Sequence, residues 1–440
     1  MRFFGREQEI ADLRKVRELS RTFSRFTVVT GRRRVGKTQL LRMALDDGES
    51  PYVHLVITRK PEKVQCEAHQ AEIERVLGLA IPYAVPRFSQ LFEMVMKQSI
   101  HQPLTLVLDE VQEFDHVDPG LFGEIAAVWD RYHNEAKVNL VVCGSVNRLI
   151  FKIFFDDSEP LYGRSTGKLH LDPFKVSVLK DIFSEFHPNY ANEDLLALWT
   201  ITGGVARYVE LLMEQGAFTQ KEMLNCIFNG MSTFLDEGRT ILSEEFGRDY
   251  GVYFSILAAV ASGRTTYAEI KNEMDMEVGG YLTKLEKYGL LSKRQPLYDT
   301  SRTKGFVYQI DDCFFRFWFR FVYRNQALVE LRNYSQLLEL VGRDFTVFTG
   351  YALERYFYWK FIEEQNYVRM GGWWDRKGEN EIDLLCERAL DGAYDVYEVK
   401  RDAERSRRDV LNMKVVAFLD KNPSLKNRTF NLLGLSVADM

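Results

Sequence analysis

The segment from Gly31 to Thr38 reads Gly-Arg-Arg-Arg-Val-Gly-Lys-Thr, which fits the spacing G-x-x-x-x-G-K-[ST] of phosphate-binding loops. Two glycines, Gly31 and Gly36, allow the backbone to curl so that its N–H groups point at phosphate oxygens. The ammonium group of Lys37 suits the β- and γ-phosphates, and the Thr38 hydroxyl suits a magnesium ion. Arg34 lies in the same loop. We therefore expect this loop to bind ATP together with Mg²⁺.

Two acids, Asp109 and Glu110, follow the apolar run 104–108, and a second polar pair follows the next apolar run. The carboxyl ends of parallel strands meet the phosphate loop at one edge of the sheet. Asp109 is the candidate for holding magnesium-bound water, and Glu110 for orienting or deprotonating the attacking water. Ser145 and Asn147 can touch the γ-phosphate or that water, or they can be ordinary loop residues.

Uninterrupted apolar runs predict the strands that position these groups. They cover residues 26–31, 51–57, 104–110 and 138–144, with helical segments between them. Runs without polar alternation are typical of parallel strands covered on both faces. From 172 to 246 the pattern becomes helical. The sequence therefore predicts an α/β, doubly wound P-loop NTPase core, followed by a helical lid.

Composition limits the other possibilities. The chain has 440 residues and a net charge of −5, so a nucleic-acid partner would require a local basic patch. Its five cysteines are scattered and contain no C-x-x-C pair, which argues against a disulfide framework or a zinc site. The first residues lack an apolar leader, and the most aromatic stretch is broken by arginines. We expect a cytoplasmic protein without a membrane partner.

Several further motifs carry a family resemblance. They are FGREQE from Phe4, GRRRVGKTQLL, LVLDE, LYGR ending at Arg164, and TGGVARY from Thr202 to Tyr208. Their combination resembles the archaeal-type ATPases, which are related to AAA+ and signal-transduction ATPases, over residues 1–245. Ala206 departs from the usual proline of that pattern.

This resemblance implies additional roles for charged residues around the nucleotide. Arg6 and Glu7 would lie near the adenine or ribose. Arg164 and Arg207 would be candidates for an arginine that senses the γ-phosphate and stabilises its charge during transfer. The alternative for either of these two arginines is a helix cap or an ion pair with a surface acid.

The stretch 249–311 reads as three helices followed by two apolar runs, an order that resembles a winged helix-turn-helix. In the third helix, Leu282 and Leu285 would face the core, with Tyr281, Lys284 and Lys287 outward. Residues 284–304 hold six Lys or Arg and two acids. This excess favours contact of Lys284, Lys287 and the wing with double-stranded DNA. The alternative is a packing module or a partner dock.

A second group of chemically active residues lies near the C-terminus. We expect Asp383 just before a strand, and Glu398 and Lys400 on one face at the end of the next strand. Two carboxylates can bind Mg²⁺, and the lysine can orient water that attacks a phosphodiester. Glu354, on a preceding helix, would add a ligand. The stretch 312–440 resembles the restriction-endonuclease-like PD-(D/E)xK fold, with Ile382 in place of the usual proline. The alternative is a salt-bridged, inactive relic.

These observations predict four parts: a P-loop ATPase core (1–171), a helical lid (172–248), a winged helix-turn-helix (249–311) and a nuclease-like α/β domain (312–440). One interpretation is an ATP-driven enzyme that acts on DNA. The other is a regulatory ATP switch whose C-terminal parts only bind partners. The sequence leaves the substrate and the oligomeric state open, a homo-oligomer included.

Overall fold

The computed structural model describes two compact units. The N-terminal unit comprises Gly5–Asp172, and the C-terminal unit comprises Pro173–Met440 together with the first residues, Met1–Phe4. The structure describes every residue except Met1, Val146, 300–305 and 376–377, and the side chain of Asn147. In the part described, no helix is both long enough and apolar enough to cross a membrane.

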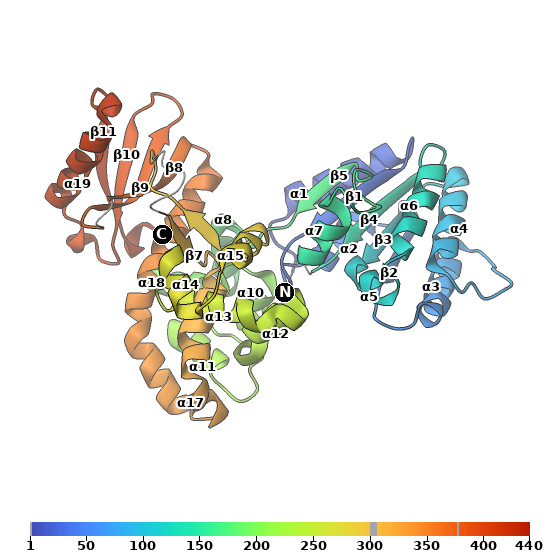
Figure 1. Cartoon of the computed structure of the whole chain (residues 1–440), viewed down its shortest axis with the longest axis horizontal. Helices are drawn as coiled ribbons and strands as arrows, with labels where there is room; N and C mark the ends of the chain where they lie inside the picture. The colour runs from blue at the N-terminus through green and yellow to red at the C-terminus, as the bar shows by residue number, and fades with distance from the viewer. Residues whose placement is uncertain (1, 146, 300–305, 376–377) are drawn as a thin grey trace. The chain divides into compact units, whose positions relative to one another are not determined.

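The N-terminal unit contains a five-stranded parallel sheet with the order β2-β3-β4-β1-β5 (Figure 1). Its strands are β1 Arg25–Thr30, β2 Tyr52–Val56, β3 Leu104–Asp109, β4 Val138–Cys143 and β5 Gly167–His170. The four strands expected from uninterrupted apolar runs are confirmed. The edge strand β5 was not expected, because its four residues alternate between half-buried and exposed positions and form no apolar run.

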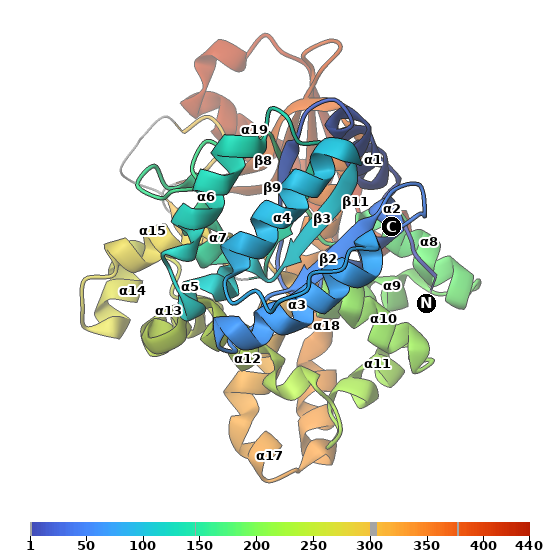
Figure 2. The same ribbon diagram turned by 90° about the vertical axis from the view of Figure 1, so that its right-hand side faces the viewer.

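Helices cover both faces of this sheet. They are α1 Glu7–Ser20, α2 Lys37–Leu45, α3 Glu62–Leu77, α4 Phe88–His101, η1 Val111–Glu113, α5 Phe114–Val117, α6 Leu121–Tyr132 and α7 Asn147–Phe155. One apolar core joins α3, α4, α6 and α7 to the sheet, and Figure 2 shows α3, α4 and α6 in front of the strands. The connections β2-to-β3, β3-to-β4 and β4-to-β5 all run in one direction along the sheet, and only the β1-to-β2 connection runs in the opposite direction. Right-handed crossovers therefore put α2 on the other face, where it packs with α1.

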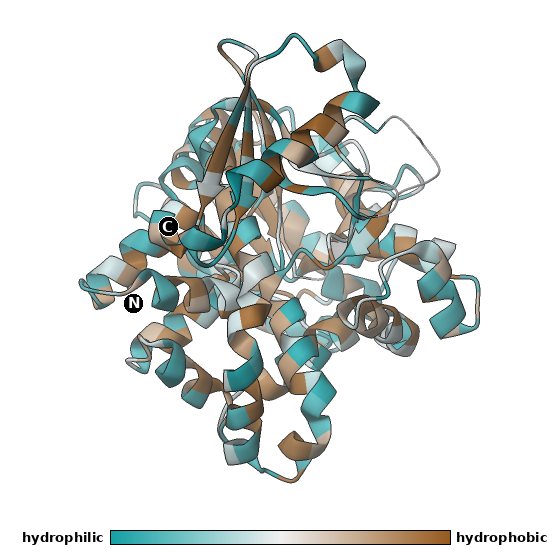
Figure 3. Ribbon diagram, turned by 90° about the vertical axis from the view of Figure 1, so that its left-hand side faces the viewer, coloured by the Kyte–Doolittle hydropathy of each residue, from teal (hydrophilic) through white to brown (hydrophobic). Residues whose placement is uncertain are grey.

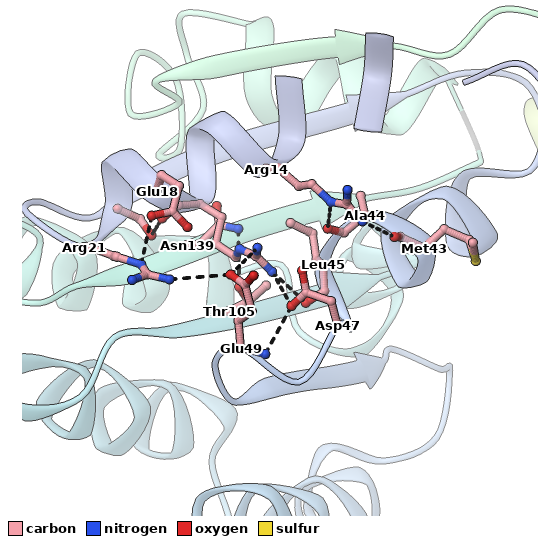
Figure 4. A network of polar contacts seen from close by, with 12 residues as sticks. Arg14, Glu18, Arg21, Met43, Ala44, Leu45, Asp47, Glu49, Thr105 and Asn139 are labelled. Carbon is pink, nitrogen blue, oxygen red and sulfur yellow. Dashed lines mark hydrogen bonds and ion pairs between the residues drawn. The ribbon is translucent and has the colours of Figure 1, made fainter. Parts of the chain in front are cut away.

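Arginines of α1 hold the carboxyl end of α2 (Figure 4). Arg14 Nε donates to the Ala44 carbonyl at 3.2 Å, and Arg17 Nη1 donates to Asp47 Oδ1 at 2.7 Å and to the Leu45 carbonyl at 3.5 Å. Positive charge at this end stabilises the last carbonyls and the dipole of the helix. These contacts fix the axis of α2, whose amino end follows the glycine-rich loop.

The C-terminal unit begins with helices alone. They are α8 Val176–Phe186, α9 Asn192–Thr202, α10 Ala206–Glu214, α11 Gln220–Ile227, α12 Phe234–Phe246 and the short η2 Gly247–Asp249. Residues 173–246 are all described and contain no strand, as the sequence predicted. The ends of the four expected parts stay predictions, and one apolar core runs from Phe174 to Met440.

Three helices and a hairpin follow in the expected order: α13 Tyr250–Ala261, α14 Tyr267–Met274, α15 Gly279–Lys287, β6 Ser292–Arg294 and β7 Val307–Gln309. In α15, Leu282 is buried, and Lys284 and Lys287 are exposed. The outward placement of Tyr281 is wrong, since its ring is half-buried 5.2 Å from the Tyr253 ring. The expected wing tip, 300–305, lies outside the described residues.

The last part of the chain forms a mixed sheet between helices (Figure 3). Before it come α16 Cys313–Phe317, a π-helical turn Trp318–Val322, η4 Tyr323–Asn325, α17 Gln326–Glu330 and α18 Tyr334–Glu364. The sheet and its following helices are β8 Tyr367–Trp374, β9 Glu381–Arg388, β10 Tyr394–Val399, η5 Ala403–Arg405, α19 Arg408–Lys421, η6 Pro423–Leu425, β11 Phe430–Leu435 and η7 Val437–Asp439.

This second sheet has the order β11-β10-β9-β8, and only β10 and β11 are parallel. One face packs on α19 and the other on α18. Strand β8 was not expected, because Gly371 and Gly372 and two register shifts interrupt its pattern. The expectation that Asp383 precedes a strand is also wrong: Asp383 is the third residue of β9.

Candidate functional site

The glycine-rich loop connects β1 to α2 and adopts the backbone that its glycines allow. Gly36 has φ +97° and Gly31 has φ +143°, both in the region that favours glycine. A Cβ atom at Gly31 would lie 2.5 Å from the carbonyl oxygen of Leu171, so no side chain fits there. Arg34 also has a positive φ, +69°. The loop therefore has the tight curl that a phosphate-binding loop requires.

Lys37 lies at the start of α2 and is only 8% exposed. Its Nζ donates to the carbonyls of Gly31 at 2.7 Å and Arg32 at 3.0 Å, and it makes no ion pair with any described residue. Burial lowers the pKa of Lys37, against the opposing charges of Glu110 and Asp109. A buried ammonium group without a carboxylate partner is stabilised by a bound anion. The loop thus favours a phosphate beside Lys37.

Asp109, the last residue of β3, is the buried acid of the site. Thr38 Oγ1 donates to its Oδ2 at 2.7 Å, and the Cys143 thiol donates to its Oδ1 at 2.8 Å. His54 Nε2 lies 3.4 Å from Oδ2. Burial raises the pKa of Asp109, but the hydrogen bonds from His54, Cys143 and Thr38 outweigh it and lower the pKa to about 2. The acid is therefore ionised at neutral pH.

Sequence reasoning missed His54 and Cys143 as partners of this acid. A signal for His54 did exist, since it is a polar residue inside an apolar strand. Strand β2 pairs in parallel with β3, with His54 opposite Val107 and Val56 opposite Asp109. Side chains two residues apart share a face of the sheet, so this register puts His54 on the face of Asp109.

Glu110 has a left-handed backbone, with φ +53°, which is uncommon for a residue with a side chain. Its Oε2 accepts hydrogen bonds from Gln112 Nε2 at 2.5 Å and from Ser145 Oγ at 2.9 Å. Ser145, expected near the γ-phosphate, thus fixes the carboxylate of Glu110, and Gln112 was missed. Asn147 begins α7, and its side chain lies outside the described part.

Three further residues expected near the nucleotide, Arg6, Glu7 and Arg207, differ in their surroundings. Arg6 is buried and donates to Glu9 at 3.1 Å and to the Asp172 carbonyl at 2.7 Å, while Glu7 is exposed. Arg207 belongs to the C-terminal unit and pairs with Glu210 at 2.6 Å. The contacts of Arg6 and Glu7 with adenine or ribose, and the sensing role of Arg207, stay predictions.

The structure does not bring Arg164 to the ATP site. Its guanidinium makes two hydrogen bonds to Asp130, at 2.8 and 2.6 Å. Asp130 is near the end of α6, and Arg164 precedes β5, whose first residue pairs with Thr27 of β1. Both therefore lie toward the amino ends of the strands, whereas the phosphate loop follows the carboxyl end of β1. Arg164 is a surface ion-pair residue in this unit.

The acids and lysine expected near the C-terminus do converge. The backbone pairing of β9 with β10 ends at Leu384 and Tyr397, and the Asp383 side chain then accepts from the Val399 N–H at 2.8 Å. Lys400 Nζ lies 3.4 Å from Asp383 Oδ2 and 3.7 Å from Glu398 Oε1. The predicted common face of Glu398 and Lys400 is confirmed.

Charges in this cluster are closely balanced. Besides Lys400, Lys414 of α19 donates to Glu398 Oε1 at 3.0 Å, and the Arg407 N–H donates to Oε2 at 3.1 Å. Burial lowers the pKa of Lys400, but the charges of Asp383 and Glu398 raise it by more than burial lowers it. The pKa is therefore above its ordinary value, and the side chain is a cation. It can orient a nucleophile or stabilise negative charge, but it cannot serve as a base at neutral pH.

The expected addition of Glu354 to the ligands of Glu398 stays a prediction. Glu354 belongs to α18, which packs on the sheet face of Tyr397, whereas Glu398 contacts Lys414 of α19 on the other face. Burial, with the charge of Asp383, raises the pKa of Glu354 to about 8. Across the described ranges, no three side chains of His, Cys, Asp or Glu are grouped so that they could hold a metal ion together.

The parallel sheet, the glycine-rich loop and the adjacent acid define a P-loop ATPase fold. Residues 3–212 match the family described as an ATPase domain predominantly from Archaea. Residues 318–410 match a family described as archaeal and bacterial proteins of unknown function. The chain is thus similar to archaeal-type ATPase domains over residues 3–212 and to the second family over residues 318–410. These matches also support nucleotide binding.

Similar proteins include an uncharacterized protein of Methanocaldococcus jannaschii, 25% identical over 95% of this chain and 93% of that protein. Among solved structures, a Walker-type ATPase of Pyrococcus abyssi is 20% identical, with a TM-score of 0.54 over 72% of this chain and 96% of that one. The ORC2 protein of Aeropyrum pernix, solved as ADPNP–ADP complexes, is 13% identical, with a TM-score of 0.50 over 76% and 94%. Both structures share the fold.

Lys37→Ala is expected to weaken ATP binding roughly 10²-fold or more, because it removes the buried charge that faces the β- and γ-phosphates. Titration with a fluorescent ATP analogue measures this loss. Lys168→Ala is the matched control, since Lys168 is exposed on β5 of the same unit. Equal affinity of Lys37→Ala and the control would contradict the assignment of this loop.

Glu110→Gln is expected to bind ATP but to hydrolyse it roughly 10²–10⁴-fold more slowly, the usual effect of removing a general base. Phosphate release under saturating ATP measures the rate. Glu113→Gln makes the same change three residues away, where Glu113 only pairs with Arg59. Wild-type turnover in Glu110→Gln would place the activation of water on another residue.

Proposed function

We propose that this chain is an ATP-hydrolysing enzyme that acts on DNA. The observation that carries the ATPase part is the 2.7 Å contact between the Thr38 hydroxyl and the ionised Asp109, next to the buried Lys37. Hydroxyl and carboxylate oxygens are the donors that Mg²⁺ prefers. Thr38 and Asp109 would therefore hold Mg²⁺, which neutralises charge on the β- and γ-phosphates when it is bound.

In this proposal each residue has one task during hydrolysis. Lys37 binds the phosphates, and the N–H groups of the loop and of the amino end of α2 direct their dipoles at the same oxygens. Glu110 orients and deprotonates the attacking water. Hydrogen bonds from Gln112 and Ser145 hold its carboxylate, so that the base is positioned before ATP arrives.

The three helices α13–α15 and the hairpin β6–β7 support the DNA-binding part of the proposal. Their order is that of a winged helix-turn-helix, in which the third helix contacts nucleic acid. Lys284 and Lys287 are both exposed on α15, one turn apart. On β6, Lys293 is also exposed and lies 3.8 Å from the ring of Phe306. This surface offers positive charge to the phosphates of a duplex.

For the C-terminal cluster we propose metal-dependent cleavage of a phosphodiester. Asp383 and Glu398 would hold a divalent ion, and Lys400 would orient the attacking water or stabilise the charge of the transition state. The neighbouring ends of β9 and β10 bring the three side chains together. Their oxygen donors fit Mg²⁺ or Mn²⁺.

The pairing of Glu398 with Lys414 favours a second candidate function. In that case the cluster is neutralised by its own lysines, and the C-terminal part grips DNA or another partner under the control of ATP without cutting. Incubation of supercoiled plasmid with Mg²⁺ or Mn²⁺, with and without ATP, separates the two. Nicking that requires the metal supports cleavage. Binding of the plasmid without any nicking supports the second candidate, a switch that grips its partner without cutting.

Lys284→Glu combined with Lys287→Glu is expected to weaken binding to duplex DNA. Each lost phosphate contact should also reduce the slope of log affinity against log salt by about one unit. Fluorescence anisotropy with a labelled duplex at several salt concentrations measures both effects. The control with the same charge change is Lys175→Glu with Lys221→Glu, two exposed lysines, one just before α8 and one on α11. A wild-type protein that binds no duplex at low salt would refute this role.

Asp383→Asn is expected to abolish metal-dependent nicking, because it removes one ligand charge and leaves Lys400 with a single acid. Lys400→Ala should still bind Mn²⁺ and lose cleavage. Calorimetric titration with Mn²⁺, paired with the plasmid assay, measures both properties. The control is Asp420→Asn, an exposed acid of α19. If Mn²⁺ does not bind and no variant or wild-type protein cuts, the switch is the better description.

A further inference from the structure

Three arginines from separate segments gather around Tyr351 of α18. The guanidinium carbon of Arg316, on α16, lies 3.7 Å from the centre of the Tyr351 ring. Arg355, one turn further along α18, is 8% exposed and lies 4.4 Å from the Tyr358 ring. Arg294 ends β6. Burial raises the pKa of Tyr351, while the charges of Arg355, Arg316 and Arg294 oppose the rise. We call these three arginines the arginine cluster.

The guanidinium groups of the arginine cluster make few direct contacts with acids. Within the described part, the Arg316 guanidinium has no hydrogen bond and no ion pair; its contact is the aromatic ring. Arg355 has one carboxylate near it, Asp311, at 3.7 Å, and its buried Nε has no hydrogen-bond partner. Arg294 donates to the neutral side chain of Gln309 at 2.9 Å. A buried guanidinium with unused donors is costly unless an anion satisfies it.

Backbone contacts hold Arg294 in this position. Arg294 pairs with Val307 in the two-stranded sheet. Just beyond it, the Leu297 N–H donates to the Gly372 carbonyl of β8 at 2.9 Å. The Tyr298 hydroxyl lies 2.7 Å from that of Tyr394. Figure 1 shows β7 of this hairpin close to the second sheet. The hairpin therefore delivers its arginine to the nuclease-like part as a fixed element.

Arg294 of the arginine cluster lies next to the part of β9 that holds Asp383. Arg294 Nη2 would be 3.1 Å from a Cβ at Gly372, and the Asp383 carbonyl would be 3.4 Å from the same point. Glu354 lies three residues after Tyr351 on the same face of α18, and the charges of Asp383, Arg294 and Lys400 all act on it. Glu354 makes no ion pair with any described residue.

From this placement we propose that Arg294, Arg316 and Arg355 bind a backbone phosphate of the nucleic acid whose neighbouring phosphodiester lies at Asp383 and Lys400. The planar fork of arginine matches phosphate oxygens two at a time, and several forks can surround one phosphate. The inference rests on the proposed action on DNA. It adds a second phosphate contact, separate from Lys284 and Lys287, within the same unit.

Arg316→Gln is expected to weaken the binding of a labelled oligonucleotide duplex roughly tenfold, the effect of losing a charge-assisted contact, and to lower the salt slope by about one unit. Arg294→Gln should have a similar effect. Arg320→Gln is the matched control: it lies four residues after Arg316, and its guanidinium pairs with Asp344 at 2.9 Å. Fluorescence anisotropy measures affinity, and thermal unfolding confirms that each variant is folded.

The outcomes separate this inference from the proposed function. Unchanged affinity in folded Arg316→Gln and Arg294→Gln, with a loss in Lys284→Glu/Lys287→Glu, would overturn the arginine contact and leave DNA binding intact. A wild type that binds no oligonucleotide would overturn both. Inorganic phosphate is the third ligand to be tested. Thermal stabilisation by phosphate that Arg316→Gln removes, without oligonucleotide binding, would reassign the cluster to a small phosphate ligand and overturn the nucleic-acid assignment.

Discussion

The buried carboxylate of Asp109 is the group around which the N-terminal unit is arranged. Taking an ionised acid out of water costs several kcal/mol, so donors must meet it from the surrounding elements. They come from Thr38 at the start of α2, from His54 in β2 and from Cys143 at the end of β4. These donors fix the register of β2 and β4 against β3, and they place the hydroxyl of α2 beside the acid.

Buried charge is compensated in two different ways in this chain, and the difference indicates where a ligand is needed. Glu398 is met by Lys414 and Lys400, so the protein itself satisfies the charge. Lys37 has only loop carbonyls, and Arg355 has an unused Nε and a carboxylate 3.7 Å away. Cations of this kind are stabilised by an anion from outside the chain. Phosphate is the anion that we propose for both surroundings.

Features set by local sequence could be predicted, and those set by distant packing could not. The glycine spacing predicted the loop before α2, and local sequence also sets the start of α14, where Thr266 and Glu269 form a capping box. The edge strands β5 and β8 were missed, because half-covered edges need no continuous apolar run. Arg164 was misplaced because a motif gives no information on which end of the sheet its residue occupies. Glu354 was assigned to the site of Glu398, but the sequence could not show that Glu354 lies on α18 while Glu398 pairs with Lys414 of α19.

The glycine-rich loop also touches the segment that leaves the N-terminal unit. Gly31 lies against the carbonyl of Leu171, and the Leu171 N–H donates to Thr30 at 2.9 Å. The next carbonyl, that of Asp172, accepts from Arg6. The chain passes from one unit to the other after Phe4 and again after Asp172. Within the N-terminal unit, the hydrogen bond of Arg6 to Asp172 therefore links the residues next to these two crossing points. The loop, Leu171, Asp172 and Arg6 are thus linked by direct contacts within the N-terminal unit.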